Sequence, residues 1–180
     1  MQRKYIFLWL PILLTSISWF VFYWLCPRLH LSQFRYSADR FIPYSEISKI
    51  ENTIRQGDRA EADLLTAKII FSLSGKSKAK WIGKSDVQNL PCAYLMKIDE
   101  IWMRTSNQKY GFAAQSQVWD KNKVDRNPRS SEEAFVKAVG WGRKETNSYP
   151  KGYFPHKIYE QGSPLAVPFS SEKLHSCQQI

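Results

Sequence analysis

An uncharged apolar stretch near the start of the chain constrains its fold more than any other feature. Residues Tyr5 to Cys26 read YIFLWLPILLTSISWFVFYWLC, which is 22 consecutive residues without a charged side chain. A helix needs roughly 20 residues to cross the hydrocarbon layer of a membrane, so this stretch can form one transmembrane helix. Trp9 and Trp24 lie toward its two ends, as aromatic residues at membrane interfaces do. We therefore expect residues 1–27 to form a membrane anchor.

A cleaved secretory signal peptide is the competing interpretation of this stretch. Arg3 and Lys4 suit the basic start of a signal peptide, but the apolar run is too long and no small-residue cleavage site follows it. We therefore favour an uncleaved, single-pass anchor. Two basic residues precede the span, and three follow it at positions 28, 35 and 40. The positive-inside tendency slightly favours a carboxyl-terminal domain on the cytoplasmic, or stromal, side.

Helical spacing of apolar residues begins after a short juxtamembrane connector at residues 28–44. Ile47, Ile50 and Ile54 recur at intervals of three and four residues, and Gly57 can end this first helix. Asp58 can cap a second helix, whose apolar face would hold Ala62, Leu65, Ile69 and Leu73. The short break between these two stretches predicts a tight antiparallel helix pair.

Further helices are predicted along the rest of the chain. One starts at Pro91 and carries Leu95, Ile98 and Trp102, and a shorter one spans 112–119. Ser130 and Glu133 have the spacing of a capping box and predict the start of a last helix. Residues 74–86 and 142–161 read as loops, and no alternating strand pattern is convincing. Residues 45–180 are therefore expected to form one compact all-α domain.

The composition and motifs favour a binding protein over an enzyme. The net charge is +10, with the basic residues dispersed among acidic ones. Such a surface suits proximity to an anionic membrane, or a basic rim that attracts an anionic ligand. There is no nucleophile elbow, zinc-binding histidine pair or dinucleotide glycine fingerprint, and no nucleic-acid recognition motif. The three histidines are scattered, and we expect them to be surface residues that bind no metal.

The three cysteines do not have the spacing of a metal site. Cys26 lies at the end of the apolar stretch, whereas Cys92 and Cys177 are far apart in the domain. Cys92 and Cys177 could pair in a disulfide, but nothing in the sequence supports this pairing. Reduced thiols in a reducing compartment are the simpler interpretation.

Two patterns point to particular residues. Asp99 lies at the margin of an apolar helical stripe, so we expect its carboxylate to be hydrogen-bonded and structural. Many aromatic residues lie next to glycine or proline in predicted loops. Most would fill a small core, as we expect for Trp119 and Phe135, but the set would also suit an apolar concavity for a planar ligand.

From about Ser45 to Pro155 the chain resembles the Gun-four (genomes uncoupled four) family of tetrapyrrole-binding proteins. Five segments carry the resemblance in the family's order: GDRAEADLLT (57–66), LPCAYLMKIDEIW (90–102), SNQKYGFAAQSQVW (106–119), VGW (139–141) and PKGYFP (150–155). The resemblance implies an all-helical domain shaped like a cupped hand that binds porphyrins on an apolar palm. It also implies a regulator of magnesium chelatase in chlorophyll synthesis that is not itself an enzyme.

The resemblance also assigns expected roles to residues of this chain. The bound ligand would be protoporphyrin IX or Mg-protoporphyrin IX, with no metal ligated by the protein. Apolar contacts would come from Tyr110, Phe112, Trp141, Tyr153 and Phe154, with Arg143 and Lys144 at the rim for the propionates. Scaffold roles would fall to Asp63, Asp99, Trp102 and Gln115.

Two functions from different classes follow from these expectations. The first is a porphyrin-binding protein anchored in a photosynthetic membrane that delivers or senses a tetrapyrrole, with the large subunit of magnesium chelatase as a partner. The second is a pigment-free module of the same fold that docks a membrane protein complex. Saturable binding of a porphyrin separates the two.

Overall fold

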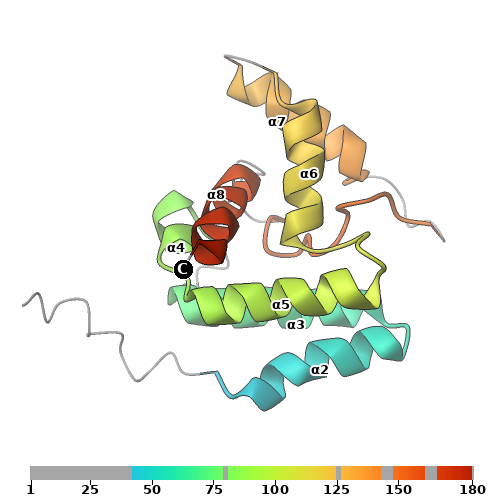
Figure 1. Cartoon of the computed structure of the whole chain (residues 1–180), viewed down its shortest axis with the longest axis vertical. Helices are drawn as coiled ribbons and strands as arrows, with labels where there is room; N and C mark the ends of the chain where they lie inside the picture. Colours follow the sequence, from blue (N-terminus) through green and yellow to red (C-terminus); the bar gives the residue numbers. More distant parts are fainter. Residues whose placement is uncertain (1–41, 79–80, 125–126, 143–147, 161–165, 180) are drawn as a thin grey trace, which may run out of the picture. The chain divides into compact units, whose positions relative to one another are not determined.

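Seven helices occur in the part of the chain that the computed structural model describes, namely residues 42–78, 81–124, 127–142, 148–160 and 166–179. In chain order they are α2 (Tyr44–Arg55), α3 (Arg59–Ser74), α4 (Lys84–Gln88), α5 (Cys92–Thr105), α6 (Phe112–Asn122), α7 (Pro128–Val139) and α8 (Ala166–Gln178) (Figure 1). These residues contain no strand, which confirms the predicted all-α class. They also contain no helix long and apolar enough to cross a membrane. The predicted anchor at residues 1–27 lies outside the described residues.

The first two described helices form the predicted hairpin. Ile47, Ile50 and Ile54 are buried where α2 packs on its neighbours. Gly57 adopts a φ of +89° in the turn, a conformation that glycine reaches without steric cost. The carboxylate of Asp58 then accepts a hydrogen bond from the backbone N–H of Glu61 at 3.0 Å and caps α3. These local signals were all readable from the sequence.

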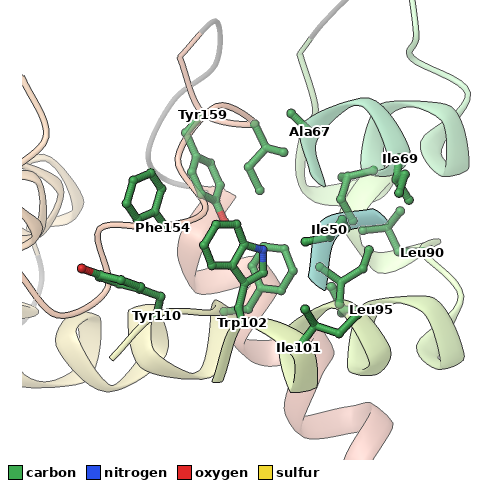
Figure 2. Close-up of a cluster of buried hydrophobic side chains, with 14 of the residues drawn as sticks. Ile50, Ala67, Ile69, Leu90, Leu95, Ile101, Trp102, Tyr110, Phe154 and Tyr159 are labelled. Atoms are coloured by element: carbon green, nitrogen blue, oxygen red, sulfur yellow. The ribbon is translucent and has the colours of Figure 1, made fainter. Parts of the chain in front are cut away.

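The indole of Trp102 lies at the centre of the core (Figure 2). Its Nε1 donates to the hydroxyl of Thr66 on α3 at 3.0 Å, so the polar end of this fully buried side chain is satisfied. The ring of Phe154 stacks on it with centroids 5.5 Å apart. The predicted scaffold helix α5 is thereby joined to α3 and to the loop that follows α7.

The start of α7 differs from the sequence prediction. We expected Ser130 and Glu133 to form a capping box, but the cap is Asn127, whose side chain accepts from the backbone N–H of Ser130 at 3.1 Å. Pro128 occupies the first turn, where its missing N–H costs nothing. The helix therefore begins earlier than predicted, because asparagine before proline is the better start signal. It ends at Gly140, which has a φ of +78°.

Two helices were not predicted. The short helix α4 lies in a segment that reads as a polar loop, because five residues are too few to show a helical period. The carboxylate of Asp86 accepts from the backbone N–H of Gly83 at 2.9 Å, and Val87 is fully buried. Helix α8 packs on α4, α5 and α6. This packing is not evident from the sequence of α8, because serines of this helix face the core. The hydroxyls of Ser171 and Ser116 lie 2.5 Å apart.

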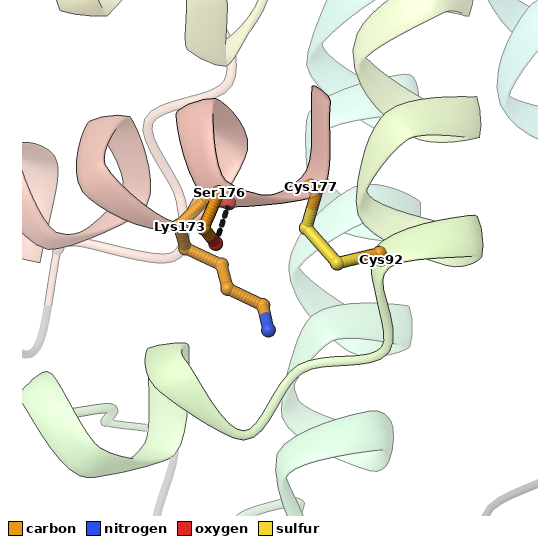
Figure 3. Close-up of a disulfide and its surroundings, with 4 residues drawn as sticks. All are labelled: Cys92, Lys173, Ser176 and Cys177. Atoms are coloured by element: carbon orange, nitrogen blue, oxygen red, sulfur yellow. Dashed lines mark hydrogen bonds between the residues drawn. A yellow bond between two sulfur atoms is a disulfide. The ribbon is translucent and has the colours of Figure 1, made fainter. Parts of the chain in front are cut away.

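A disulfide joins Cys92 at the start of α5 to Cys177 near the end of α8 (Figure 3). Their Cα atoms are 5.3 Å apart, although 85 positions separate the residues in sequence. We expected reduced thiols, so the structure corrects this expectation. The physical reason is that the proximity of the two cysteines depends on the docking of α8, which no local pattern in the sequence reveals.

Candidate functional site

A groove of about 640 Å³ runs along one face of α3. Its size falls within the range of roughly 300–1,000 Å³ that is typical of small-molecule sites. The first wall is α3 itself, and the second is the segment 157–160, which follows the aromatic loop at residues 148–156. The lining residues are Glu61, Leu64, Leu65, Ala67, Lys68, Phe71, Ser72, Ser77, Lys157 and Glu160.

The first wall follows from the helical period of α3. Positions 61, 64, 65, 68, 71 and 72 succeed one another at intervals of one to four residues and share one side of the helix. Leu64 projects from this side with 49% of its surface exposed. The opposite side of α3 carries Ile70 and Leu73, which are buried in the core. Helix α3 is thus apolar on two sides, and one of them faces the groove.

The buried carboxylate of Asp63 holds the second wall against α3. One oxygen, Oδ1, accepts from the backbone N–H of His156 at 3.0 Å and from that of Lys157 at 3.2 Å. The other, Oδ2, lies 3.0 Å from Nδ1 of the His156 ring. Asp63 is fully buried, so these bonds compensate for the loss of its hydration. The position of the 157–160 segment therefore depends on a residue 94 positions before Lys157 in the chain.

Charged groups of both signs line the groove. On the second wall, Nζ of Lys157 contacts Oε1 of Glu160 at 2.5 Å, and Nε2 of His156 lies 3.1 Å from the same oxygen. On the first wall, Lys68 has no ion-pair partner among the described residues. The groove thus combines apolar contact area with two glutamates, one lysine that pairs with no described residue and one lysine that is already paired.

The aromatic residues Trp141 and Tyr153 lie next to the second wall. The ring of Trp141 stacks on Tyr159 with centroids 5.2 Å apart and lies 5.9 Å from the ring of His156. Its Nε1 donates to the carbonyl oxygen of Tyr153 at 2.8 Å. Both side chains are half-buried, and neither lines the groove. Burial raises the pKa of the Tyr159 hydroxyl, so this phenol stays neutral behind the wall.

Three of the other predicted contact residues lie in the core. Tyr110, Phe112 and Phe154 are only 5%, 2% and 4% exposed. The ring of Tyr110 meets the edge of Phe154 with centroids 5.2 Å apart (Figure 2). The three side chains fill the core beneath the aromatic loop, to which Phe154 itself belongs, and they offer no open surface in this structure. The predicted rim cations Arg143 and Lys144 lie outside the described residues.

The predicted scaffold residues make specific polar contacts. Oδ1 of Asp99 accepts from the backbone N–H of Ala113 at 3.0 Å, which confirms the predicted hydrogen bonding of this carboxylate. Burial raises the pKa of Asp99, and the backbone N–H groups at the start of α6 partly offset this effect. The side chain of Gln115 donates to the carbonyl oxygen of Pro155 at 2.6 Å. The first contact joins α5 to α6, and the second fixes the aromatic loop to α6.

The groove residues Leu64, Lys68 and Lys157 were not predicted. A signal for the first wall is present in the sequence, because ADLLTAKIIFSL carries apolar residues on more than one side of a helix.

We also expected His156 to be a surface residue, whereas both of its ring nitrogens contact carboxylates. The described residues contain no cluster of His, Cys, Asp or Glu that could hold a metal ion. The groove offers apolar contact area together with two lysines and two glutamates in its walls.

Comparison with known sequences places the chain among related proteins. The sequence model of a family described as GUN4-like matches residues 38–175. A Porphyra purpurea protein called "Uncharacterized protein ycf53" is 30% identical over 103 residues, which are 54% of this chain and 38% of that protein. The chloroplastic tetrapyrrole-binding protein of Arabidopsis thaliana is 27% identical over 78 residues, which are 42% of this chain and 29% of that protein. The matched region thus covers well under half of either relative.

Two solved structures share the fold. The ligand-free GUN4 of Arabidopsis thaliana superposes with a TM-score of 0.56 at 20% identity and covers 71% of this chain and 96% of that chain. GUN4 from Chlamydomonas reinhardtii gives a TM-score of 0.56 at 23% identity and covers 69% of this chain and 85% of that chain. At these identities the likeness establishes the helical fold.

Proposed function

The chain belongs to the GUN4-like family, a family of non-catalytic binding and regulatory proteins, and on that premise we propose that it binds a tetrapyrrole in the groove along α3. The observation that carries the proposal is the groove itself, a largely apolar space of about 640 Å³ with two lysines and two glutamates in its walls. The flat face of a tetrapyrrole would lie against Leu64, Leu65 and Phe71. Its acidic side chains would remain near Lys68 and Lys157, because burying a carboxylate without a cation is costly.

The preferred pigments are protoporphyrin IX and Mg-protoporphyrin IX. Both are planar and largely apolar, and both carry two propionates, which would pair with the two lysines of the groove walls. The macrocycle supplies its own four nitrogens to the magnesium, so the protein need not provide a metal-binding cluster. Trp141 and Tyr153 would stiffen the second wall from behind. Arg143 and Lys144 would serve as further cations for the propionates.

The biological role that follows is regulation of magnesium chelatase in chlorophyll synthesis, with the large chelatase subunit as protein partner. The 22-residue uncharged stretch from Tyr5 to Cys26 supports an anchored form of this regulator. The protein would then hold its pigment beside a photosynthetic membrane, with the domain on the cytoplasmic or stromal side. Mass spectrometry of the mature protein tests the anchor, since an amino terminus near residue 26 would show that the stretch is removed.

Pigment binding is tested with the full chain in lipid nanodiscs. Protoporphyrin is titrated while tryptophan fluorescence is followed, and empty nanodiscs give the correction for pigment that partitions into lipid. Saturable quenching at micromolar pigment is expected. Absence of saturable quenching would overturn pigment binding in favour of a pigment-free module that docks a membrane complex.

A matched pair of variants locates the pigment. Leu64→Ser removes an exposed apolar side chain from the groove, and Met96→Ser removes one of similar exposure from α5, outside the groove. Loss of about half of a leucine contact is worth roughly 1 kcal/mol, so Leu64→Ser should weaken binding about fivefold. Met96→Ser should leave it unchanged. Equal effects of the two changes would place the pigment elsewhere on the protein.

A further inference from the structure

The two lysines of the groove are in different electrostatic states. Lys68 on α3 has no ion-pair partner among the residues that the structure describes. Lys157 on the facing wall already contacts a carboxylate, since its Nζ lies 2.5 Å from Oε1 of Glu160. Both members of this pair line the groove. A ligand carboxylate that approaches Lys157 therefore meets a competitor that belongs to the protein.

We propose that Glu160 is a specificity-determining residue that competes with one ligand carboxylate for Lys157, so that it lowers the preference of the groove for ligands with two free carboxylates over esterified ones. This inference rests on the proposed function of the groove. The first carboxylate pairs with Lys68 without displacing any described group. The second replaces Glu160 at Lys157, and this exchange of partners forms and breaks no covalent bond.

The surroundings of Glu160 keep the free-energy cost of this exchange small. Its side chain is 43% exposed, so the released carboxylate can be hydrated. Nε2 of His156 also lies 3.1 Å from Oε1 of Glu160, and that imidazole is held in turn by Asp63. Glu160 thus keeps one neighbour after it leaves Lys157. A ligand without carboxylates cannot make the exchange and leaves the pair intact.

The position of Lys157 is fixed independently of Glu160. The backbone N–H of Lys157 donates to Asp63, which belongs to α3 and lies five residues before Lys68. Both lysines are therefore held relative to the same helix. Changing the side chain of Glu160 should alter the competition and leave the wall in place.

The test compares Glu160→Gln with Glu61→Gln in the full chain in nanodiscs. Glu61 also lines the groove, so its variant removes the same charge from the same site without touching the pair with Lys157. The probes are protoporphyrin IX and its dimethyl ester. Exposed ion pairs of this kind change affinities by about two- to fivefold. Glu160→Gln should tighten binding of the free acid by that factor, should exceed the effect of Glu61→Gln, and should leave the ester unchanged.

A second variant isolates Lys157. Lys157→Gln should weaken binding of the free acid, and the loss should be larger in the Glu160→Gln background, where the lysine is fully available. Equal effects of Glu160→Gln and Glu61→Gln, or equal effects on acid and ester, would overturn the competition while leaving pigment binding intact. If the wild-type protein binds neither probe, the proposed function fails and the competition fails with it.

Discussion

Replacing Asp63 with alanine should destabilise the domain and release the second wall of the groove. The change removes the acceptor of two backbone N–H groups, those of His156 and Lys157, together with the partner of the His156 ring. Each donor left without a partner costs about 1–3 kcal/mol. We expect a total loss of about 3–5 kcal/mol, a large part of the roughly 5–15 kcal/mol that stabilises a typical domain.

The measurement is urea unfolding of the full chain in a mild detergent, followed by tryptophan fluorescence. Asp63→Asn keeps one carbonyl oxygen as an acceptor at nearly constant volume, so its loss should be smaller, about 1–2 kcal/mol. Asp58→Ala is the control for a carboxylate that caps a helix at the surface, and it should cost about 1 kcal/mol. The reasoning is refuted if Asp63→Ala costs no more than Asp58→Ala, or if the alanine and asparagine variants are equally unstable.

Three further predictions concern the framework of the site. Gly111→Ala should lower the free energy of unfolding in urea by at least about 2 kcal/mol. Gly111 has a φ of +118°, and a Cβ there would lie 2.7 Å from a carboxylate oxygen of Asp99. An unchanged free energy of unfolding would contradict this geometry. Cys177→Ser should lower the free energy of unfolding by about 4 kcal/mol, because the disulfide with Cys92 closes a loop of 85 residues. A reducing agent should lower the stability of the wild type but not that of the variant. Hydrogen bonds from Arg104 and Arg55 lower the pKa of Glu51 from its ordinary value of 4.5 to about 2, so the ionised pair stabilises the fold above pH 4.5 and is lost as the pH falls toward 2. Thermal melts of Glu51→Gln should show a shallower decline across that range, and identical profiles would count against the pair.

The parts of the fold that were predicted correctly depend on local signals. The isoleucines of α2, the cap at Asp58 and the stripe of α5 each involve residues within one or two helical turns of one another. Such spacings are set by the period of the helix and can be read without tertiary information. The short helix α4 and the serine-bearing helix α8 lack that period, so their apolar signal was too weak to detect.

The candidate site was harder to predict because it is made by contacts across the chain. The sequence identified aromatic residues next to glycine and proline, and the structure places Trp141 and Tyr153 beside the groove. It could not show that Tyr110 and Phe154 turn inward, since loop residues have no period that separates a core side from an open side. The second wall was missed because its position is set by Asp63, 93 residues earlier.

The separation of the two walls has a consequence for synthesis of the protein on the ribosome. Helix α3 emerges long before residues 157–160, so a nascent chain that has exposed only its first wall offers an open apolar helix side and no groove. Closing the groove requires a contact between residues 93 positions apart, which forms late because of its loop-closure entropy. A pigment that needed both walls would therefore be taken up only after the chain is nearly complete, and its binding would report that translation of the domain has finished.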